Sequence, residues 1–384
     1  MKRTLTLIII TLLMTACTNN KVKKIDAICS ELFPADEPGA AVLVMKGDKI
    51  IFDKGYGISD IKTKAPIDGN TFFNIASVSK QFTAVAALKL AQDGKISLDD
   101  SVKKYFPYFK ADFFNDIKLK HLLSHSSGIP DTRPRTDRNF VLFGTDKECI
   151  QYMADLDSLN FAPGTNYEYI NPTFQLFYTI IENVSGETFE QFVQKNIFDK
   201  AGMTQTTYFE PDKVIPNMAH GYEYEDVSNG PEERISTKED LNNKKGKKWY
   251  EFDYGEETFF ATKADGGIYS STHEFVKWEK ALRNNTIISE ESKELAQSPH
   301  TKVSGSSFSS YQNQPNISYG YGWFIDETPG KTKTIYHTGD NGGFKILACR
   351  YPEKELLILV FANRADWDRT KLRHDLENVL LEDK

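Results

Sequence analysis

The feature that most constrains the fold is a predicted helix that is apolar on almost every face. Residues Ser77–Gln92 place alanine, valine, leucine and phenylalanine around the whole circumference of a helix, and Asp93-Gly94 then provides a C-terminal stop. A helix without a polar face is buried at the centre of a domain. The rest of the chain is therefore expected to wrap around this segment.

Predicted strands occur at both ends of the chain. Near the N-terminus, residues 40–45 and 50–52 predict a hairpin around the turn Lys46-Gly47-Asp48-Lys49. Near the C-terminus the predicted strands are residues 319–325, 333–337, 344–351 and 355–361. The short connections between these C-terminal strands favour an antiparallel sheet.

Most segments between the two sets of strands have helical patterns. The predicted helices cover residues 121–123, 147–153, 174–184 and 188–197, and a further helix follows the capping-box pair Ser271 and Glu274. A last helix is predicted over residues 367–381. Residues Glu223–Lys248 are dense in charges of both signs, so we expect an exposed insertion or flexible loop there.

These patterns predict an α/β (α+β) fold. One antiparallel sheet would be assembled from N- and C-terminal segments and flanked by helices, with a mainly helical subdomain inserted. The predicted domain spans residues 25–384, with its sheet part in about 25–80 and 262–384 and its helical part in about 81–261.

The first 16 residues predict a secretory signal peptide, because Lys2 and Arg3 precede an apolar run that is too short to cross a bilayer. The sequence Met14-Thr15-Ala16-Cys17 is similar to the lipobox of bacterial lipoproteins. If Cys17 is lipidated, residues 17–24 would form a tether, and the protein would be exported and anchored to the bacterial cell envelope. The alternative is a plain signal peptide that is cut nearby.

Composition argues against several classes of protein. The net charge of -7 disfavours a nucleic-acid partner. Cys29, Cys149 and Cys349 are widely spaced, which favours buried thiols over a disulfide framework, with one disulfide as the alternative. His121 and His125 lack the glutamate of an H-E-x-x-H sequence, so no metal site is expected.

The apolar helix begins with Ser77-Val78-Ser79-Lys80, an S-x-x-K sequence. Residues three apart share one face of a helix, so Lys80 would lie beside the Ser77 hydroxyl. Burial lowers the pKa of a lysine, which can then accept a proton from a serine nucleophile. The same pattern also fits a surface helix with Ser77 as its N-cap, but the apolar flanks favour burial of Lys80.

Two further patterns could complete such a site. Tyr169-Ile170-Asn171 supplies an amide and a phenol, and a phenol can act as a base beside a lysine ammonium. His337-Thr338-Gly339 lies at the end of a predicted strand and supplies an imidazole, a hydroxyl and a glycine that lets a substrate approach the strand edge. Each pattern could also be an ordinary loop or strand end.

In this order the three patterns resemble the penicillin-recognising serine enzymes. The similarity is to the branch that holds class C β-lactamases, D-alanyl-D-alanine carboxypeptidases, D-aminopeptidases and β-lactamase-like esterases, whose second element is Y-x-N. Other phrases of this branch are His121-Leu122-Leu123-Ser124-His125-Ser126-Ser127-Gly128, Pro163-Gly164-Thr165 and Asp265-Gly266-Gly267-Ile268-Tyr269-Ser270. The resemblance covers roughly residues 39–363.

The resemblance implies a β-lactamase/transpeptidase-like fold and a role for each matching residue. Ser77 would be the acylated nucleophile. Lys80 and Tyr169 would transfer its proton, and Asn171 would contact the substrate amide.

The strand pattern carries further implied roles. The backbone N–H groups of Ser77 and Asp340 would form the oxyanion hole, with Thr338 and Gly339 at the substrate-binding edge. His337 replaces the lysine of class C β-lactamases, which puts β-lactam hydrolysis in doubt. We expect a charged His337 to bind a substrate carboxylate, so that recognition weakens as pH rises. The alternative is a neutral His337 that only donates a hydrogen bond.

The resemblance thus implies a serine hydrolase that forms an acyl-enzyme on Ser77. The expected activity is that of a penicillin-binding-type peptidase or amidase on D-amino-acid peptides, including cell-wall peptides. A β-lactamase-like carboxylesterase, a class C-type β-lactamase and a non-catalytic binding or sensor protein stay open as alternatives. The expected partner is a small-molecule or peptide substrate, with no metal or organic cofactor and no implied oligomeric state.

Overall fold

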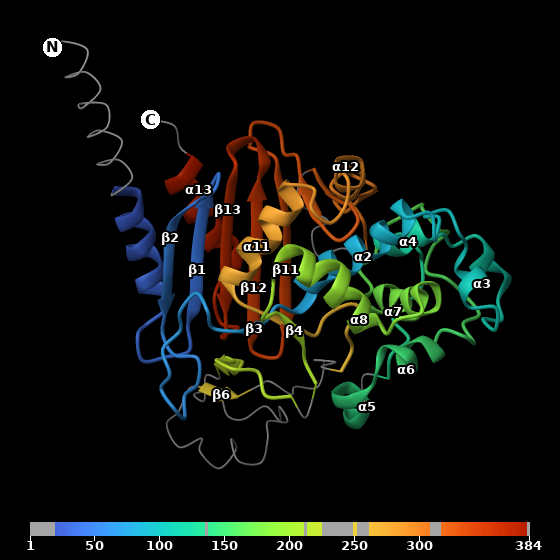
Figure 1. The fold of residues 1–384 in the computed structure, drawn as a ribbon, viewed down its shortest axis with the longest axis horizontal. Coiled ribbons are helices and arrows are strands. Elements are labelled where there is room, and N and C mark those ends of the chain that lie inside the picture. Colours follow the sequence, from blue (N-terminus) through green and yellow to red (C-terminus); the bar gives the residue numbers. More distant parts are fainter. Residues whose placement is uncertain are drawn as a thin grey trace, which may run out of the picture.

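The computed structural model describes residues 20–134, 137–210, 213–224, 249–251, 261–307 and 316–381. An 8-stranded sheet with the order β2-β1-β13-β12-β11-β10-β9-β8 dominates one side of the molecule (Figure 1). Its strands are β1 (Ala40–Lys46), β2 (Lys49–Tyr56), β8 (Thr301–Lys302), β9 (Ile317–Tyr319), β10 (Phe324–Asp326), β11 (Thr334–Asn341), β12 (Phe344–Tyr351) and β13 (Leu356–Ala362). Neighbouring strands are antiparallel, which confirms the predicted sheet built from both ends of the chain.

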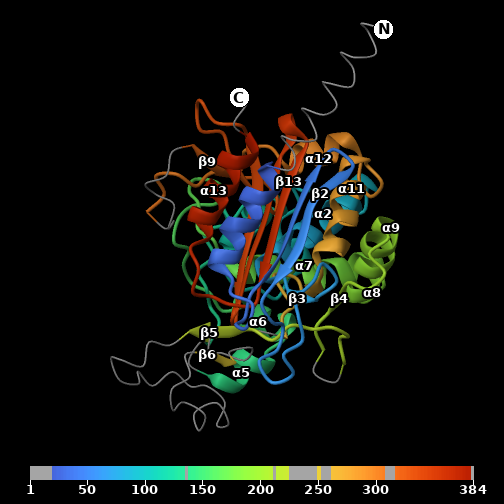
Figure 2. The ribbon, with the colours of Figure 1, turned by 90° about the vertical axis from the view of Figure 1, so that its left-hand side faces the viewer.

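Helices cover both faces of this sheet (Figures 1 and 2). The side chains of Ala41, Leu43 and Met45 in β1 join one core cluster with α2 (Lys80–Gln92) and α11 (Thr272–Arg283). The alternating residues of β1 join a second cluster with α13 (Arg369–Leu381) and the helix over residues 20–32. The sheet is therefore buried on both faces, as its apolar strands require.

The remaining elements lie mostly beside the sheet, on the right of Figure 1. The helices are η1 (Ala76–Ser79), α3 (Val102–Tyr105), η2 (Asp112–Asn115), α4 (Leu119–Leu123), α5 (Arg138–Phe143), α6 (Asp146–Gln151), α7 (Asn171–Ser185), α8 (Phe189–Val193), η3 (Gln194–Phe198), α9 (Asp199–Ala201), α12 (Glu290–Ala296) and η5 (Pro352–Lys354). Two small sheets consist of β3 (Phe73–Asn74), β7 (Ile268–Ser270) and β4 (Thr207–Tyr208), and of β5 (Tyr222–Tyr224) and β6 (Trp249–Glu251).

The apolar helix predicted over residues 77–92 is present and central. Its first turn is the 3-10 turn η1, after which α2 continues with nearly every side chain buried. Phe82 stacks on Trp278 of α11 with ring centroids 4.2 Å apart. The helix ends at Gln92 with Asp93 as its C-cap, and Gly94 follows with φ of +68°, a conformation that suits glycine.

Three predicted boundaries are wrong. The single strand predicted over 319–325 is two strands, β9 and β10, separated by a turn in which Gly322 has φ of +89°. The His-Thr-Gly strand does not end at His337 but continues as β11 to Asn341. Residues 20–24 of the predicted tether are helical, and Lys21 Nζ donates to Leu380 O at 3.1 Å. Tertiary contacts set these boundaries, and the local sequence pattern does not reveal such contacts.

Other expectations have clear outcomes. Cys29, Cys149 and Cys349 are free and buried, as the thiol interpretation predicted. Ser271 Oγ accepts a hydrogen bond from Glu274 N at 3.2 Å, which confirms the predicted N-cap of α11. Residues 225–248 of the predicted insertion, and Cys17, lie outside the described residues. Among the described helices, none has the length and apolar character needed to cross a membrane.

Candidate active site

A strained turn presents Ser77 at the start of the central helix. The preceding residue, Ala76, has φ of +48°, which is unusual for a residue with a Cβ atom. The buried Asn74 side chain accepts a hydrogen bond from Ala76 N at 2.8 Å. Ala76, Val78 and Ser79 are buried, whereas Ser77 is only partly so. The turn thus leaves one hydroxyl accessible at a helix N-terminus, where the first N–H groups lack helical partners.

Lys80 lies beside this hydroxyl, as the three-residue spacing predicted. Its Nζ is 3.1 Å from Ser77 Oγ and donates to Asp265 O at 2.8 Å. The side chain is completely buried. Burial lowers the pKa of Lys80 to about 7, with the Asp265 carboxylate opposing this shift and Arg133 adding to it. A substantial fraction of Lys80 is therefore neutral at pH 7 and can accept a proton.

A buried carboxyl group holds the segment that supplies the acceptor for Lys80. Asp146 accepts hydrogen bonds from Lys263 N at 2.7 Å and from Ala264 N at 3.0 Å. Gln175 Nε2 donates to Asp265 Oδ1 at 3.2 Å. Burial, and then the nearby Asp265 carboxylate, raise the pKa of Asp146 to about 8. These contacts fix the backbone carbonyl that orients Lys80 Nζ.

Tyr169 packs against Lys80. Lys80 Nζ lies 5.0 Å from the centroid of the Tyr169 ring. The tyrosine ring also contacts His125, with ring centroids 4.2 Å apart, and His125 Nδ1 accepts a hydrogen bond from Ile170 N at 3.3 Å. Asn171 follows as the first residue of α7, a helix that packs on α2. The structure thus gathers Ser77, Lys80 and Tyr169, and places Asn171 at the adjoining helix start.

Two of the short phrases of the sequence form one loop structure under Tyr169. Glu168 N donates to His125 O at 3.0 Å, and Gly164 N donates to Ser126 O at 2.7 Å. Gly128 has φ of +76°, and a Cβ atom there would lie 2.0 Å from a backbone oxygen of residue 161. His125 is therefore a buried structural residue that supports the tyrosine.

Strand β11 forms the opposite side of the site. A Cβ atom on Gly339 would lie 2.5 Å from Ile75 O and 3.0 Å from Ala76 Cβ, so only glycine allows the strand to come this close to η1. Strand β10 pairs with β11 only over Thr334–Tyr336, which leaves Thr338 and Asp340 beyond the last pair. The Asp340 carboxylate pairs with Arg369 Nη2 at 2.9 Å.

His337 does not carry the charge that we expected. Its side chain is 1% exposed, Nε2 lies 2.9 Å from the Tyr319 hydroxyl, and Nδ1 lies 2.6 Å from Thr338 O. In a neutral ring, Nδ1–H donates to that carbonyl and Nε2 accepts from the tyrosine. Burial, and then the nearby Lys80, lower the pKa of His337 to about 3. Without a substrate the structure therefore favours a neutral His337, contrary to the charged form that we expected, and both ring nitrogens are engaged within the protein.

The Beta-lactamase family matches residues 29–381 of this chain. The chain belongs to this family. Penicillin-binding protein 4* of Bacillus subtilis (strain 168) is 26% identical over 360 residues, covering 90% of this chain and 73% of the relative. Protein flp of Staphylococcus aureus (strain N315) is 28% identical over 358 residues, and the match covers 91% of this chain but only 64% of that protein.

A solved structure of a D-amino acid amidase from Ochrobactrum anthropi SV3 has the same fold. It aligns with a TM-score of 0.73 and 20% identity, and the alignment covers 94% of this chain and 98% of the amidase. The predicted family and fold are thereby confirmed. Membership in this family of β-lactamase-like serine hydrolases supports a hydrolase activity.

Sequence reasoning missed several residues of this β-lactamase-family site. Asn74 bonds the turn before Ser77, and Asp146 holds the segment that supplies the acceptor for Lys80. Tyr319 contacts His337, and all three of these supporting residues are buried. None of the three belongs to a sequence motif with a recognisable spacing, so the sequence alone did not identify them. Asp265 could have been found, because it begins one of the short sequences shared with the family branch. Its contact with Lys80, however, depends on how α2 packs against the segment before β7.

Replacing Asp265 by asparagine is expected to move the pH dependence of catalysis. The carboxylate raises the pKa of Lys80, so its removal should lower that pKa. The midpoint of the rise in kcat/KM for an uncharged ester should shift downward by about one pH unit. Asparagine keeps the backbone carbonyl and an acceptor for Gln175. Asp93→Asn, at the exposed end of α2, is the control, and an unchanged or raised midpoint for Asp265→Asn would contradict the assignment.

A neutral His337 gives a second pH prediction. The ratio of kcat/KM for a D-Ala-D-Ala peptide to that for an uncharged ester should stay flat between about pH 5 and 8. The titration of Lys80 affects both substrates and cancels in the ratio. A ratio that falls around pH 6.5 would mean that a histidine such as His337 is charged in the complex.

Proposed function

We propose that this protein is a penicillin-binding-type amidase or peptidase that forms an acyl-enzyme on Ser77 with D-amino-acid amides or peptides. The observation that carries this proposal is the contact of 3.1 Å between Lys80 Nζ and Ser77 Oγ, made by a buried lysine whose pKa is about 7. A serine hydroxyl becomes an effective nucleophile when such a base takes its proton.

The proposed reaction has two halves. Ser77 Oγ attacks the substrate carbonyl carbon while its proton passes to neutral Lys80, and the backbone N–H groups of Ser77 and Asp340 stabilise the oxyanion. The C–N bond then breaks, and the proton moves through Lys80 and Tyr169 to the leaving nitrogen. In the second half water attacks the ester carbonyl and gives its proton to the same pair. The bond between the carbonyl carbon and Ser77 Oγ then breaks, the pair returns the proton to Oγ, and the carboxylic acid leaves.

The neutral His337 bears on the choice of substrate. A lysine at this position would offer a cation to a substrate carboxylate, whereas the buried neutral imidazole offers none. Substrates whose leaving group lacks a carboxylate therefore fit the β11 side of the site better. A D-amino acid amidase among the structural neighbours, and a penicillin-binding protein among the relatives, support this substrate class. An uncharged ester meets the same requirement, so a carboxylesterase is the second candidate.

A substrate panel tests the proposal. Turnover should be measured for D-amino amides, their L enantiomers, a D-Ala-D-Ala peptide, p-nitrophenyl esters and a chromogenic cephalosporin. We expect the D-amide to exceed both its L enantiomer and the D-Ala-D-Ala peptide in kcat/KM by about tenfold or more. Turnover of esters alone would instead identify an esterase, and a single stoichiometric acylation without turnover would identify a binding or sensor protein.

We further propose that Cys17 carries lipid and anchors the protein to the cell envelope. The apolar run that ends at Thr15-Ala16-Cys17 supports this proposal. The protein expressed with its leader should partition into the detergent phase, and Cys17→Ser should shift it to the aqueous phase or stop its processing. Wild-type protein found in the aqueous phase without a lipid mass at Cys17 would refute the anchor.

A further inference from the structure

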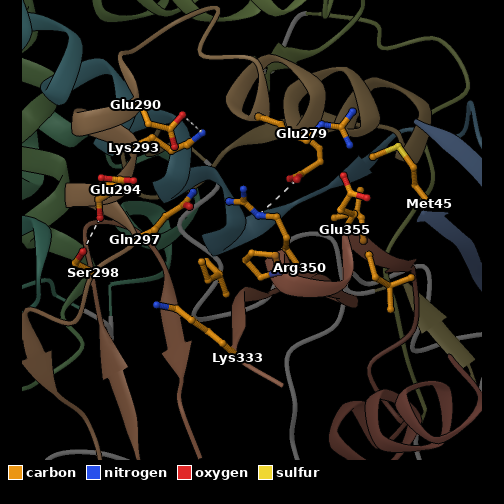
Figure 3. Close-up of a pocket in the computed structure, with 15 residues that line it drawn as sticks. Met45, Glu279, Glu290, Lys293, Glu294, Gln297, Ser298, Lys333, Arg350 and Glu355 are labelled. Atoms are coloured by element: carbon orange, nitrogen blue, oxygen red, sulfur yellow. Dashed lines mark hydrogen bonds and ion pairs between the residues drawn. The ribbon is translucent and has the colours of Figure 1, made fainter. Parts of the chain in front are cut away.

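A separate cavity of about 570 Å³ lies away from Ser77, between α11, α12 and the sheet (Figure 3). Lys333 and Ile335, at the start of β11, line it, whereas the candidate active site uses the other end of this strand. Its volume is in the range of pockets that hold small ligands. None of the candidate active-site residues is among its lining.

Arg350 offers hydrogen-bond donors to this cavity. Its Nε lies 3.5 Å from Glu279 Oε1, which is an ion pair but too long for a good hydrogen bond. The Arg350 side chain is only 13% exposed. Within the described parts of the chain its guanidinium makes no hydrogen bond at ordinary distance, so its planar set of donors is available to an acceptor in the cavity. A carboxylate is the acceptor that this geometry fits best.

Gln297, at the end of α12, adds a second donor. Its side chain is 9% exposed, and its buried Nε2 has no hydrogen-bond partner among the residues that the structure describes. A buried amide N–H without an acceptor costs free energy of folding, and a bound ligand with an acceptor would remove that cost. Figure 3 shows the polar ends of Gln297 and Arg350 turned toward the same part of the cavity.

The lining also carries carboxylates, one of which, Glu279, is the ion-pair partner of Arg350 described above. Glu279 and Glu355 both line the cavity, and Figure 3 shows the Glu279 carboxylate turned toward Arg350. Burial raises the pKa of Glu279. Glu355 has no ion-pair partner in the described ranges, whereas Glu290 is already paired with Lys293 at 2.9 Å. A plain anion would meet these carboxylates unfavourably. A ligand with an ammonium and a carboxylate matches both kinds of lining group, the donors and the carboxylates.

We propose that this cavity binds a free α-amino acid with an apolar side chain. The α-carboxylate would contact Arg350 and Gln297, and the α-ammonium would lie at Glu279 and Glu355. The apolar side chain would rest on the buried Met45, Ile335 and Leu357, which line the cavity as well. This inference goes beyond the proposed hydrolase and does not depend on it.

Leucine is the probe for a calorimetric titration at pH 7, with two analogues that each lack one charge. 4-Methylpentanoate lacks the ammonium and 3-methylbutylamine lacks the carboxylate. We expect leucine to bind with a Kd below about 10 mM and each analogue to bind about tenfold more weakly. Binding should persist after Ser77 has been blocked with a fluorophosphonate, because the two sites are separate. No binding of leucine, equal binding of either analogue, or loss of binding on blocking Ser77 would overturn the proposal.

Two variants test the donors directly. Gln297→Met removes the amide at nearly constant size, and Arg350→Lys keeps a cation beside the buried Glu279, so that folding is protected. Each should weaken leucine binding by about tenfold and leave ester turnover unchanged. Gln194→Met, which alters a surface glutamine bound to Asp199, is the matched control. Wild-type affinity for leucine in Gln297→Met would overturn the assigned site.

Discussion

Replacing Ser77 by alanine is expected to abolish covalent labelling by a fluorophosphonate and to lower turnover by about 10⁴-fold or more. The reason is that Ser77 Oγ is the group beside the buried Lys80 base, at 3.1 Å. Mass spectrometry of the labelled wild type should place the adduct on Ser77. Turnover should be followed with the best substrate of the panel.

The same motif offers a matched control, Ser79→Ala. Ser79 is buried two residues further along, and its hydroxyl has no hydrogen-bond partner among the described residues, so alanine removes little. This variant should keep both the label and most of the activity. Labelling that survives Ser77→Ala but disappears in Ser79→Ala would refute the assignment of the nucleophile.

Lys80→Met and Tyr169→Phe are each expected to lower kcat/KM by about 10³-fold, and the double variant by little more. In the proposed mechanism the two groups act on one proton, and their placement supports this: Lys80 Nζ contacts Ser77 and lies over the Tyr169 ring. Methionine nearly fills the volume of the lysine, which limits the cavity that the change creates. The measurement is a double-mutant cycle on one ester substrate.

Tyr167→Phe is the control for this cycle, because Tyr167 is a buried neighbour in the same loop but not a proposed base. It should leave kcat/KM within a few-fold of the wild-type value. Losses for Lys80→Met and Tyr169→Phe that multiply in the double variant would contradict a shared proton and assign the two residues to independent steps.

The parts of the fold and site that follow from local chemistry were predictable. The burial of α2 follows from its composition, and the contact of Ser77 with Lys80 follows from helical spacing. The contacts of Lys80 with Tyr169 and of η1 with β11 did not follow from any spacing, and only the family resemblance implied them. The resemblance in turn could not indicate the charge of His337.

The charge of His337 depends on contacts that no short pattern encodes. Tyr319 comes from another strand and occupies the ring nitrogen that a substrate would need, and the surrounding core removes water. The same holds for Asp146, whose role depends on two backbone N–H groups far along the chain. Tertiary packing decides such features, so a single sequence cannot supply them.

The pairing of β1 with β13 joins segments from opposite ends of the chain, with Ala40 opposite Ala362. Such distant pairing costs much chain entropy before it contributes stability, so it is expected to form late in folding. Until then a chain has Ser77 and Lys80 but lacks β11 beside them, because β11 belongs to the same C-terminal part of the sheet. The proposed site is therefore complete only after the C-terminal strands have joined the sheet. A partly folded chain would carry the proposed nucleophile and its base without strand β11 on the other side of the site.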